Sequence, residues 1–243
     1  EQTKKQIFEA VDKSLERLQT DYIDLYQLHW PDRPMSLFGG SINYQHVEGD
    51  ANSIESILGA LSELIKIGKI RNIGLSNETP WGTMEFIHQS KDKDLPKMQS
   101  IQNAYNLLNR IFEFGGSEIA FRESVGLLAY SPLAQGYLTG KYQNGNLPKG
   151  SRKELFDRLQ RYEGVGSEEA IESYLNIAKK YNVDPSQLAN QFVTTRPFVT
   201  SNIIGATSME QLKLAVTSIE VNLTEEIEND IEKAFQKHGN VAS

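Results

Sequence analysis

Apolar residues along the chain alternate between the period of a helix and the period of a strand. Thr3 and Gln6 have the spacing of a helix-capping box. The apolar positions that follow are three or four residues apart and predict an amphipathic helix over Ile7, Val11, Leu15 and Leu18. Residues 22–28 form a β-branched and aromatic run, which predicts a strand. It ends before Pro31, because proline cannot continue a strand ladder.

The same order of helix and strand recurs through the rest of the sequence. Further helices are predicted over 54–65, from Pro80 to Ile87, around 118–122, over 168–181, from Pro185, after Ser208 and after Thr224, with Gly68 closing the first of these. The intervening strands are predicted at 72–76, 99–102, 126–131 and 202–206. Strands that alternate with helices form a parallel sheet, either in a (β/α) barrel or in a doubly wound sheet.

Each predicted strand ends on polar or small residues that chemistry could use. In a barrel, the active-site groups project from the carboxyl ends of the strands. The residues at these ends are His29, Ser76, Asn77, Gln102, Asn103, Tyr130, Ser131, Gly205, Ala206 and Thr207. Taken singly, each has a structural explanation as a packing residue, a capping turn or a satisfied core hydroxyl. Their presence at all five strand ends favours a binding site.

These residue types suit a nicotinamide dinucleotide. An aromatic face such as Tyr130 can stack on a nicotinamide ring, and Ser76, Asn77 and Gln102 can hydrogen-bond its carboxamide. The segment 132–165, rich in glycine, proline and basic residues, is longer than ordinary connections and is expected to bind a ligand. Its pyrophosphate donors would be Ser131, the backbone of residues 133–136, and Lys141, while a helix N-terminus after Thr207 favours a second anion.

Composition excludes several other classes of protein. The 243 residues include no cysteine, and the formal net charge is −7. A thiolate metal site and a cysteine nucleophile are therefore excluded, and a large nucleic-acid interface is not expected. No apolar run is long enough to span a bilayer, which predicts a cytoplasmic protein without membrane contact. The four histidines show no metal-binding spacing, which argues against a metal-dependent barrel hydrolase and predicts no metal site.

Five stretches resemble, in order and spacing, the aldo-keto reductase family. They are YIDLYQLHWPD, GKIRNIGLSNETP, SIQNAYNLLNR, LLAYSPLAQGYLTGKY and NIIGATSMEQL. Within the family, the likeness is strongest to the bacterial Tas-like reductases and the branch of potassium-channel β-subunits. The resemblance implies a (β/α)8 TIM barrel, present here as a partial barrel of about five strands with their helices. We therefore expect one domain over residues 1–243 that lacks the amino-terminal region of the family.

The resemblance also implies a role for each site residue. His29 would be the histidine of an Asp-Tyr-Lys-His tetrad at the carbonyl of a small-molecule substrate. Ser76, Asn77 and Gln102 would hold the carboxamide of NADPH or NADP+, and Tyr130 would stack on the nicotinamide. The remaining cofactor contacts would come from a set lining the phosphates: Ser131, Leu133, Gly136, Lys141, Arg152, Gly205, Thr207 and Gln211. Arg152 has an equally good explanation as a solvated loop cation.

The sequence departs from the family pattern in two respects. No residue here matches the aspartate, tyrosine and lysine of the tetrad, so we expect this chain alone to be inactive although its parent protein reduces aldehydes or ketones. Leu214 and Ala215 stand where relatives often have polar residues for the adenine, which predicts a weaker adenine site. The alternative is a non-catalytic nicotinamide-binding subunit that senses redox state. The substrate-facing segment 32–52 and the oligomeric state are left open.

Overall fold

The computed structural model describes residues 2–35, 47–156 and 160–242, in which helices and strands alternate along the chain. The strands are β1 (Ile23–Leu28), β2 (Ile70–Ser76), β3 (Met98–Ala104), β4 (Gly126–Tyr130) and β5 (Val199–Ile203). The helices are α1 (Lys4–Leu18), α2 (Ile54–Lys66), α3 (Pro80–Asp92), α4 (Gly116–Glu123), α5 (Arg152–Phe156), α6 (Ser167–Lys180), α7 (Pro185–Thr194), α8 (Met209–Thr217) and α9 (Glu225–His238).

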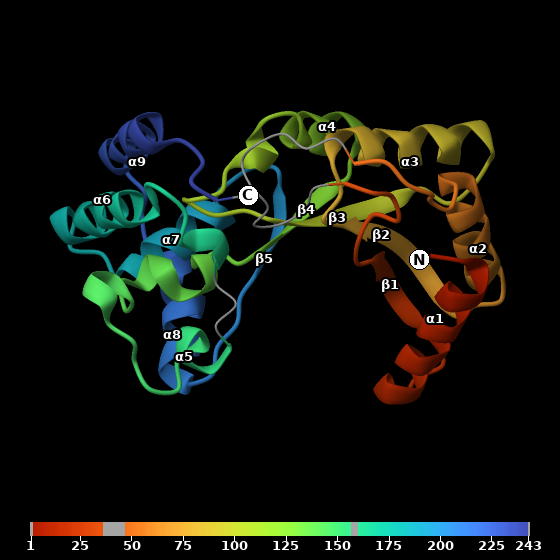
Figure 1. Ribbon diagram of the computed structural model, residues 1–243, viewed down its shortest axis with the longest axis horizontal. Coiled ribbons are helices and arrows are strands. Elements are labelled where there is room, and N and C mark those ends of the chain that lie inside the picture. Colours follow the sequence, from red (N-terminus) through yellow and green to blue (C-terminus); the bar gives the residue numbers. More distant parts are fainter. Residues whose placement is uncertain (1, 36–46, 157–159, 243) are drawn as a thin grey trace. The chain divides into compact units, whose positions relative to one another are not determined.

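The five strands belong to one sheet in the order β1-β2-β3-β4-β5, which is the sequence order (Figure 1). The described chain divides into two compact units. The first unit comprises residues 2–35, 47–103 and 115–127, and the second comprises 104–114, 128–156 and 160–242. Sequential parallel strands joined by helices confirm the predicted α/β class, and the strand order is the one a (β/α) barrel requires.

In the first unit, local capping signals set the helix boundaries. Thr3 and Gln6 form the predicted capping box at the start of α1, and the side chain of Ser53 caps α2. Thr79 caps α3 ahead of Pro80, which occupies the first helical turn because it has no N–H to lose there. After α2, Gly68 adopts a positive φ of 79°, which is the left-handed conformation predicted for a residue just beyond a helix end.

The register of the strands brings three strand ends to one edge of the sheet. Leu28 at the end of β1 pairs with Leu75, and Ser76 at the end of β2 pairs with Gln102. Both pairings are parallel, so the residues that follow the three strands emerge on the same side. The core beneath them is built from the apolar faces of α2 and the strands, in which Leu58, Leu61, Leu64, Ile73 and Met98 are fully buried.

Several expected boundaries differ in the structure, and three of the differences bear on the proposed site. The fifth strand was expected at 202–206 but runs from Val199 to Ile203, so Gly205 lies in the loop beyond it. The fourth strand ends at Tyr130, because Ser131 turns into the left-handed region with a φ of 58°. The segment 132–165 is not a plain loop, because it contains α5 and three short 3-10 turns. Periodicity over so few residues does not reveal such turns.

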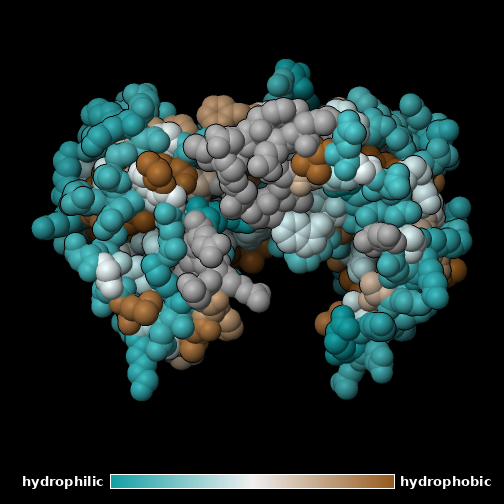
Figure 2. Space-filling model, viewed as in Figure 1, coloured by the Kyte–Doolittle hydropathy of each residue, from teal (hydrophilic) through white to brown (hydrophobic). Residues whose placement is uncertain are grey.

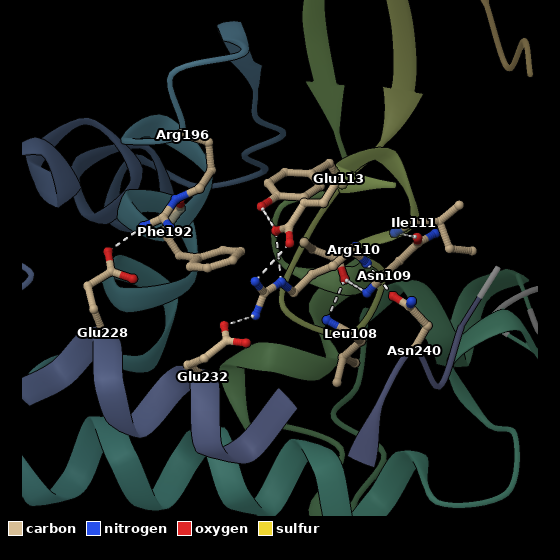
Figure 3. A network of polar contacts seen from close by, with 12 residues as sticks. Leu108, Asn109, Arg110, Ile111, Glu113, Phe192, Arg196, Glu228, Glu232 and Asn240 are labelled. Carbon is tan, nitrogen blue, oxygen red and sulfur yellow. Dashed lines mark hydrogen bonds and ion pairs between the residues drawn. The ribbon is translucent and has the colours of Figure 1, made fainter. Parts of the chain in front are cut away.

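In the second unit, a buried arginine joins elements far apart in the sequence. The Arg110 guanidinium contacts Glu113 through two N–O distances of 2.8 Å and Glu232 on α9 at 3.1 Å (Figure 3). It also lies over the rings of Phe192 and Phe235, whose centroids are 5.4 and 4.0 Å away. This network therefore fastens α7 and α9 to residues 104–114.

The surface of the second unit carries apolar side chains around α5 and α8 (Figure 2). None of the residues of α8 is buried, and Met209, Val216 and Ile219 beyond its end are among the exposed ones. Within the described ranges, no helix combines the length and the apolar character that crossing a membrane would need. The prediction of a single domain over 1–243 stays a prediction.

Candidate active site

The residues expected at the nicotinamide carboxamide come together at the strand ends of the first unit. The Ser76 hydroxyl donates to the carbonyl oxygen of Gln102 at 2.8 Å, and the Asn77 backbone N–H donates to the same oxygen at 2.9 Å. Ser76 and Asn77 are both buried. The Gln102 amide donates to the side chain of Gln27 on β1. These three predicted residues therefore form one hydrogen-bonded group across three strands.

His29 is tied to this group through its backbone. The Asn77 side-chain amide donates to the His29 carbonyl oxygen at 2.9 Å. Asn77 adopts a positive φ of 58°, a conformation that asparagine tolerates better than most residues. The His29 side chain is exposed, and its ring lies 5.0 Å from that of Trp30 between centroids. The histidine is thus fixed at its main chain while its imidazole stays accessible to a substrate.

A buried ion pair that the sequence did not suggest supports these strand ends. Glu78 follows Asn77 directly and is 4% exposed, and Arg33 contacts both of its carboxylate oxygens. The Asn103 side chain closes the arrangement, because it accepts from the Glu78 N–H at 3.2 Å and donates to the Glu78 carbonyl at 2.9 Å. Arg33 also lies over the Trp81 ring. The signal in the sequence was a pair of oppositely charged residues, Arg33 and Glu78, a few positions beyond the ends of the adjacent strands β1 and β2.

The turn expected to hold pyrophosphate lies after β4 in the second unit. Four of its residues have positive φ, namely Ser131, Ala134, Gln135 and Gly136. Successive left-handed residues turn backbone N–H groups toward one side, which is the geometry of anion-binding turns. The carbonyl of Leu133 accepts from Gly136 at 2.8 Å and from Leu138 at 3.2 Å, which closes the turn.

The backbone conformation favours glycine at position 136, and the missing side chain leaves room for the end of the Lys141 side chain. The φ of Gly136 is 103°, and a Cβ there would lie 2.8 Å from Cε and 3.0 Å from Nζ of Lys141. The Lys141 side chain therefore packs directly against the turn, as expected for a cation that serves a phosphate held there. This cradle, which any side chain would fill, fits the dinucleotide phosphates that the sequence predicted.

Tyr130, the expected stacking residue, is half-buried at the end of β4. Burial raises the pKa of its hydroxyl, and the nearby Arg161 guanidinium partly offsets that rise. Arg161 Nη1 lies 3.5 Å from the hydroxyl oxygen, which is at the limit of a hydrogen bond. Arg161 was not anticipated, because it follows a stretch with no periodic pattern.

The residues expected at the adenosine phosphate lie at two helix starts. Thr207 and Gln211 bracket the N-terminus of α8, where both the N–H and the hydroxyl of Thr207 donate to the Gln211 side chain. Arg152 is the first residue of α5 and is exposed. Capping explains Thr207 and Gln211 without a ligand, so their phosphate role stays a prediction. Leu214 and Ala215 lie on α8, partly exposed.

Some of the sequence predictions fall on residues outside the described part of the chain. Residues 36–46 of the substrate-facing segment 32–52 and residues 157–159 of the segment 132–165 are among these. Across the described ranges, no cluster of three or more histidine, aspartate or glutamate side chains could hold a metal ion.

Comparison with known proteins decides the family. The model of the aldo/keto reductase family matches residues 1–235. The chain belongs to the aldo/keto reductase family. It is 47% identical to Protein tas of Escherichia coli K12, over 96% of this chain and 67% of that protein. It is 40% identical to an aldo-keto reductase of Babesia bovis, over 97% of this chain and 88% of that protein.

A more distant relative is also similar. L-glyceraldehyde 3-phosphate reductase of Escherichia coli K12 is 28% identical over 91% of this chain and 60% of its own length. Family membership and these relatives indicate that the protein is an oxidoreductase, from a family that typically uses nicotinamide cofactors.

Proposed function

We propose that this protein reduces an aldehyde or a ketone to an alcohol with NADPH, as a cytoplasmic enzyme. Membership of the aldo/keto reductase family supports the oxidoreductase chemistry. The name of one relative, L-glyceraldehyde 3-phosphate reductase, states that this relative reduces an aldehyde. The partner would be a small carbonyl compound, and the net charge of −7 disfavours nucleic acid.

One observation carries the proposal: His29 and the carboxamide-binding candidates form a single bonded group. Asn77 holds the His29 carbonyl, and both Asn77 and Ser76 bond to the carbonyl of Gln102. A hydrogen-bond donor for a substrate is therefore fixed to the residues expected to orient the cofactor. Positioning of this kind is a major source of rate enhancement.

The chain's own residues would then act as follows. A bound nicotinamide supplies hydride. The His29 imidazole donates a hydrogen bond to the carbonyl oxygen, polarises it and orients it. In the first unit, Ser76, Asn77 and Gln102 hold the carboxamide. In the second unit, Tyr130 would stack on the ring, and the residues that would hold the phosphates are Ser131, Leu133, Gly136, Lys141, Arg152, Gly205, Thr207 and Gln211.

NADPH is proposed over NADH because cations lie on the segment expected to hold phosphate. Arg152 begins α5, and Thr207 with Gln211 lies at a helix N-terminus, where anions are favoured. Residues that match the family's proton-donating tyrosine and its lysine are not present at the strand ends that the structure describes.

The test compares His29→Ala with wild type in the intact protein. We expect kcat for NADPH oxidation with 4-nitrobenzaldehyde or methylglyoxal to fall about 100-fold, because one transition-state hydrogen bond is lost. The dissociation constant for NADPH should stay within about twofold, since His29 contacts the substrate rather than the dinucleotide. Steady-state kinetics and fluorescence titration measure the two quantities.

His88→Ala is the matched control, because His88 is an exposed histidine on α3. It should change neither quantity. An unchanged kcat in His29→Ala would remove His29 from the chemistry. Tight NADPH binding by a wild-type protein that turns over neither carbonyl compound would favour a redox-sensing subunit instead.

A further inference from the structure

A glutamate in the second unit holds a lysine beside the turn expected to bind phosphate. Glu163 Oε1 lies 2.6 Å from Lys153 Nζ and also accepts the hydroxyl hydrogen of Tyr137. The Lys153 ammonium lies over the rings of Tyr137 and Tyr142, with centroids 5.4 and 5.9 Å away. We call Tyr137, Tyr142, Lys153 and Glu163 the Glu163 cluster.

The position of Glu163 is fixed by the residue before it. Tyr162 is 1% exposed, and its hydroxyl oxygen accepts a hydrogen bond of 3.0 Å from the side-chain amide of Asn106. The same amide nitrogen donates to the carbonyl of Ser131 at 2.9 Å. Ser131 opens the left-handed turn described above. Glu163 is thus anchored through one buried asparagine to the turn itself.

A second lysine shares the same aromatic surface. Lys141, which packs against Gly136, lies 5.1 Å from the Tyr142 centroid, on a ring that Lys153 also approaches. Two ammonium groups therefore face one ring, and Glu163 pairs with only one of them, Lys153. The proximity of Lys153 lowers the pKa of Glu163, so the glutamate is charged at neutral pH.

The ion pair is open to exchange. The side chains of Lys153 and Glu163 are each about one-third exposed. Ion pairs at such exposure are screened by water and contribute little net stability. A 2′-phosphate monoester carries more negative charge than a carboxylate and presents three terminal oxygens, and a pyrophosphate carries two negative charges over four terminal oxygens, so either group can compete for the same ammonium group.

We propose that Glu163 is an internal counter-ion that competes with a phosphate of the bound dinucleotide for Lys153, and so sets the affinity for the cofactor. This inference rests on the proposed function. Without a ligand, Glu163 neutralises Lys153 and keeps the side chain near the turn. With a dinucleotide bound, a phosphate oxygen takes the place of the carboxylate. Lys153 is then a phosphate contact, and Glu163 is a positioning residue that opposes it.

The test is Glu163→Gln in the intact protein, titrated with NADPH and with NADH by cofactor fluorescence. The amide oxygen of glutamine can still accept from Tyr137, but the competing charge is gone. We expect NADPH to bind about three- to tenfold more tightly at low salt, and the gain to shrink at high salt. Equal tightening of NADH would identify the pyrophosphate as the group that Lys153 binds. Tightening of NADPH alone would identify the 2′-phosphate.

Two further variants separate this mechanism from a general effect of charge. Glu154→Gln removes the same charge from the same segment, but its carboxylate accepts from the Gly150 N–H instead of pairing with a lysine. It should change the affinity by less than about twofold. Lys153→Met should weaken NADPH binding and should abolish the effect of Glu163→Gln in the double variant.

The outcomes that overturn the inference are distinct from those that overturn the proposed function. Weaker or unchanged binding in Glu163→Gln, or equal tightening in Glu154→Gln, rules out a competing counter-ion. If Glu163→Gln does not fold, Lys153→Met decides, because unaltered NADPH affinity there removes Lys153 from the phosphate site. A wild-type protein that binds neither dinucleotide contradicts the proposed function itself.

Discussion

The second unit contains two clusters built from the same chemical groups: a tyrosine hydroxyl that donates to a glutamate, which in turn pairs with a cation. In one, Tyr105 and Arg110 meet at Glu113, and Figure 3 shows the contact between Arg110 and Glu113. In the other, Tyr137 and Lys153 meet at Glu163. Tyr105 is fully buried and Arg110 is 7% exposed, whereas the side chains of Lys153 and Glu163 are about one-third exposed.

Burial and the type of cation decide whether such a cluster stabilises the fold or can exchange its cation with a ligand. The guanidinium of Arg110 is saturated by two carboxylates and two aromatic rings, which leaves no room for a competing ligand. Lys153 pairs with one carboxylate oxygen beside a turn suited to anions. A planar guanidinium suits a fixed bidentate pair, and a lysine on a flexible stem suits an exchangeable one.

The largest expected effect on protein stability comes from the Arg110 cluster, which consists of Tyr105, Arg110 and Glu113. Arg110→Met should lower the free energy of unfolding by about 3–5 kcal/mol, because Glu113 and Tyr105 lose their compensating charge in a largely buried setting. Urea unfolding followed by circular dichroism measures the change. Arg122→Met removes an exposed arginine paired with Glu118 and should cost less than about 1 kcal/mol. Equal losses in the two variants would mean that burial does not distinguish these arginines.

A smaller effect should appear at alkaline pH. Burial, together with the charge and hydrogen bond of Glu113, raises the pKa of Tyr105 far above its ordinary value. A raised folded-state pKa gives stability that is complete below about pH 10 and is lost as pH rises further, because the unfolded state releases its proton first. Above pH 10, wild type should therefore lose stability faster than Tyr105→Phe, by at most about 1.4 kcal/mol per pH unit.

The Glu163 cluster provides the contrast in that experiment. Burial and the hydrogen bond to Glu163 raise the pKa of Tyr137 to about 12, and Lys153 opposes the rise. The stability advantage of Tyr137→Phe over wild type should therefore stop growing near pH 12, whereas the advantage of Tyr105→Phe should keep growing as pH rises further. Urea unfolding at several values between pH 9 and pH 13 compares how the free energy of unfolding depends on pH in the three proteins. If the free energy of unfolding depends on pH identically in both variants and wild type, folding does not raise the pKa of either hydroxyl.

The smallest expected effect on stability comes from the Glu163 cluster. Glu163→Gln should change the free energy of unfolding by less than about 1 kcal/mol, because water already screens the pair with Lys153. Urea unfolding beside the binding titration separates stability from affinity. A loss of several kcal/mol would make the Glu163 cluster structural, like the Arg110 cluster, and would remove the basis for an exchangeable cation.

Much of the fold could be predicted because the signals that set it are local. Helix starts at Thr3, Thr79 and Ser208 follow from side chains that cap the next turn, and the structure confirms all three. The fifth strand was misplaced by three residues at each end. Its five residues carry no clear alternation, and its boundary depends on which backbone groups find partners in the sheet. Pairing of that kind is a property of the tertiary structure.

The sequence by itself determined the class of fold, the family and the strand-end residues His29, Ser76, Asn77 and Gln102, because spacing and residue type suffice for these. Only the tertiary structure decided what those residues contact and which charged residues support them. Arg33 with Glu78, and Lys153 with Glu163, are 45 and 10 positions apart in residue number and share no motif. Each pair exists because folding places the two charges within hydrogen-bond distance, and burial then decides whether a ligand can exchange with one of them.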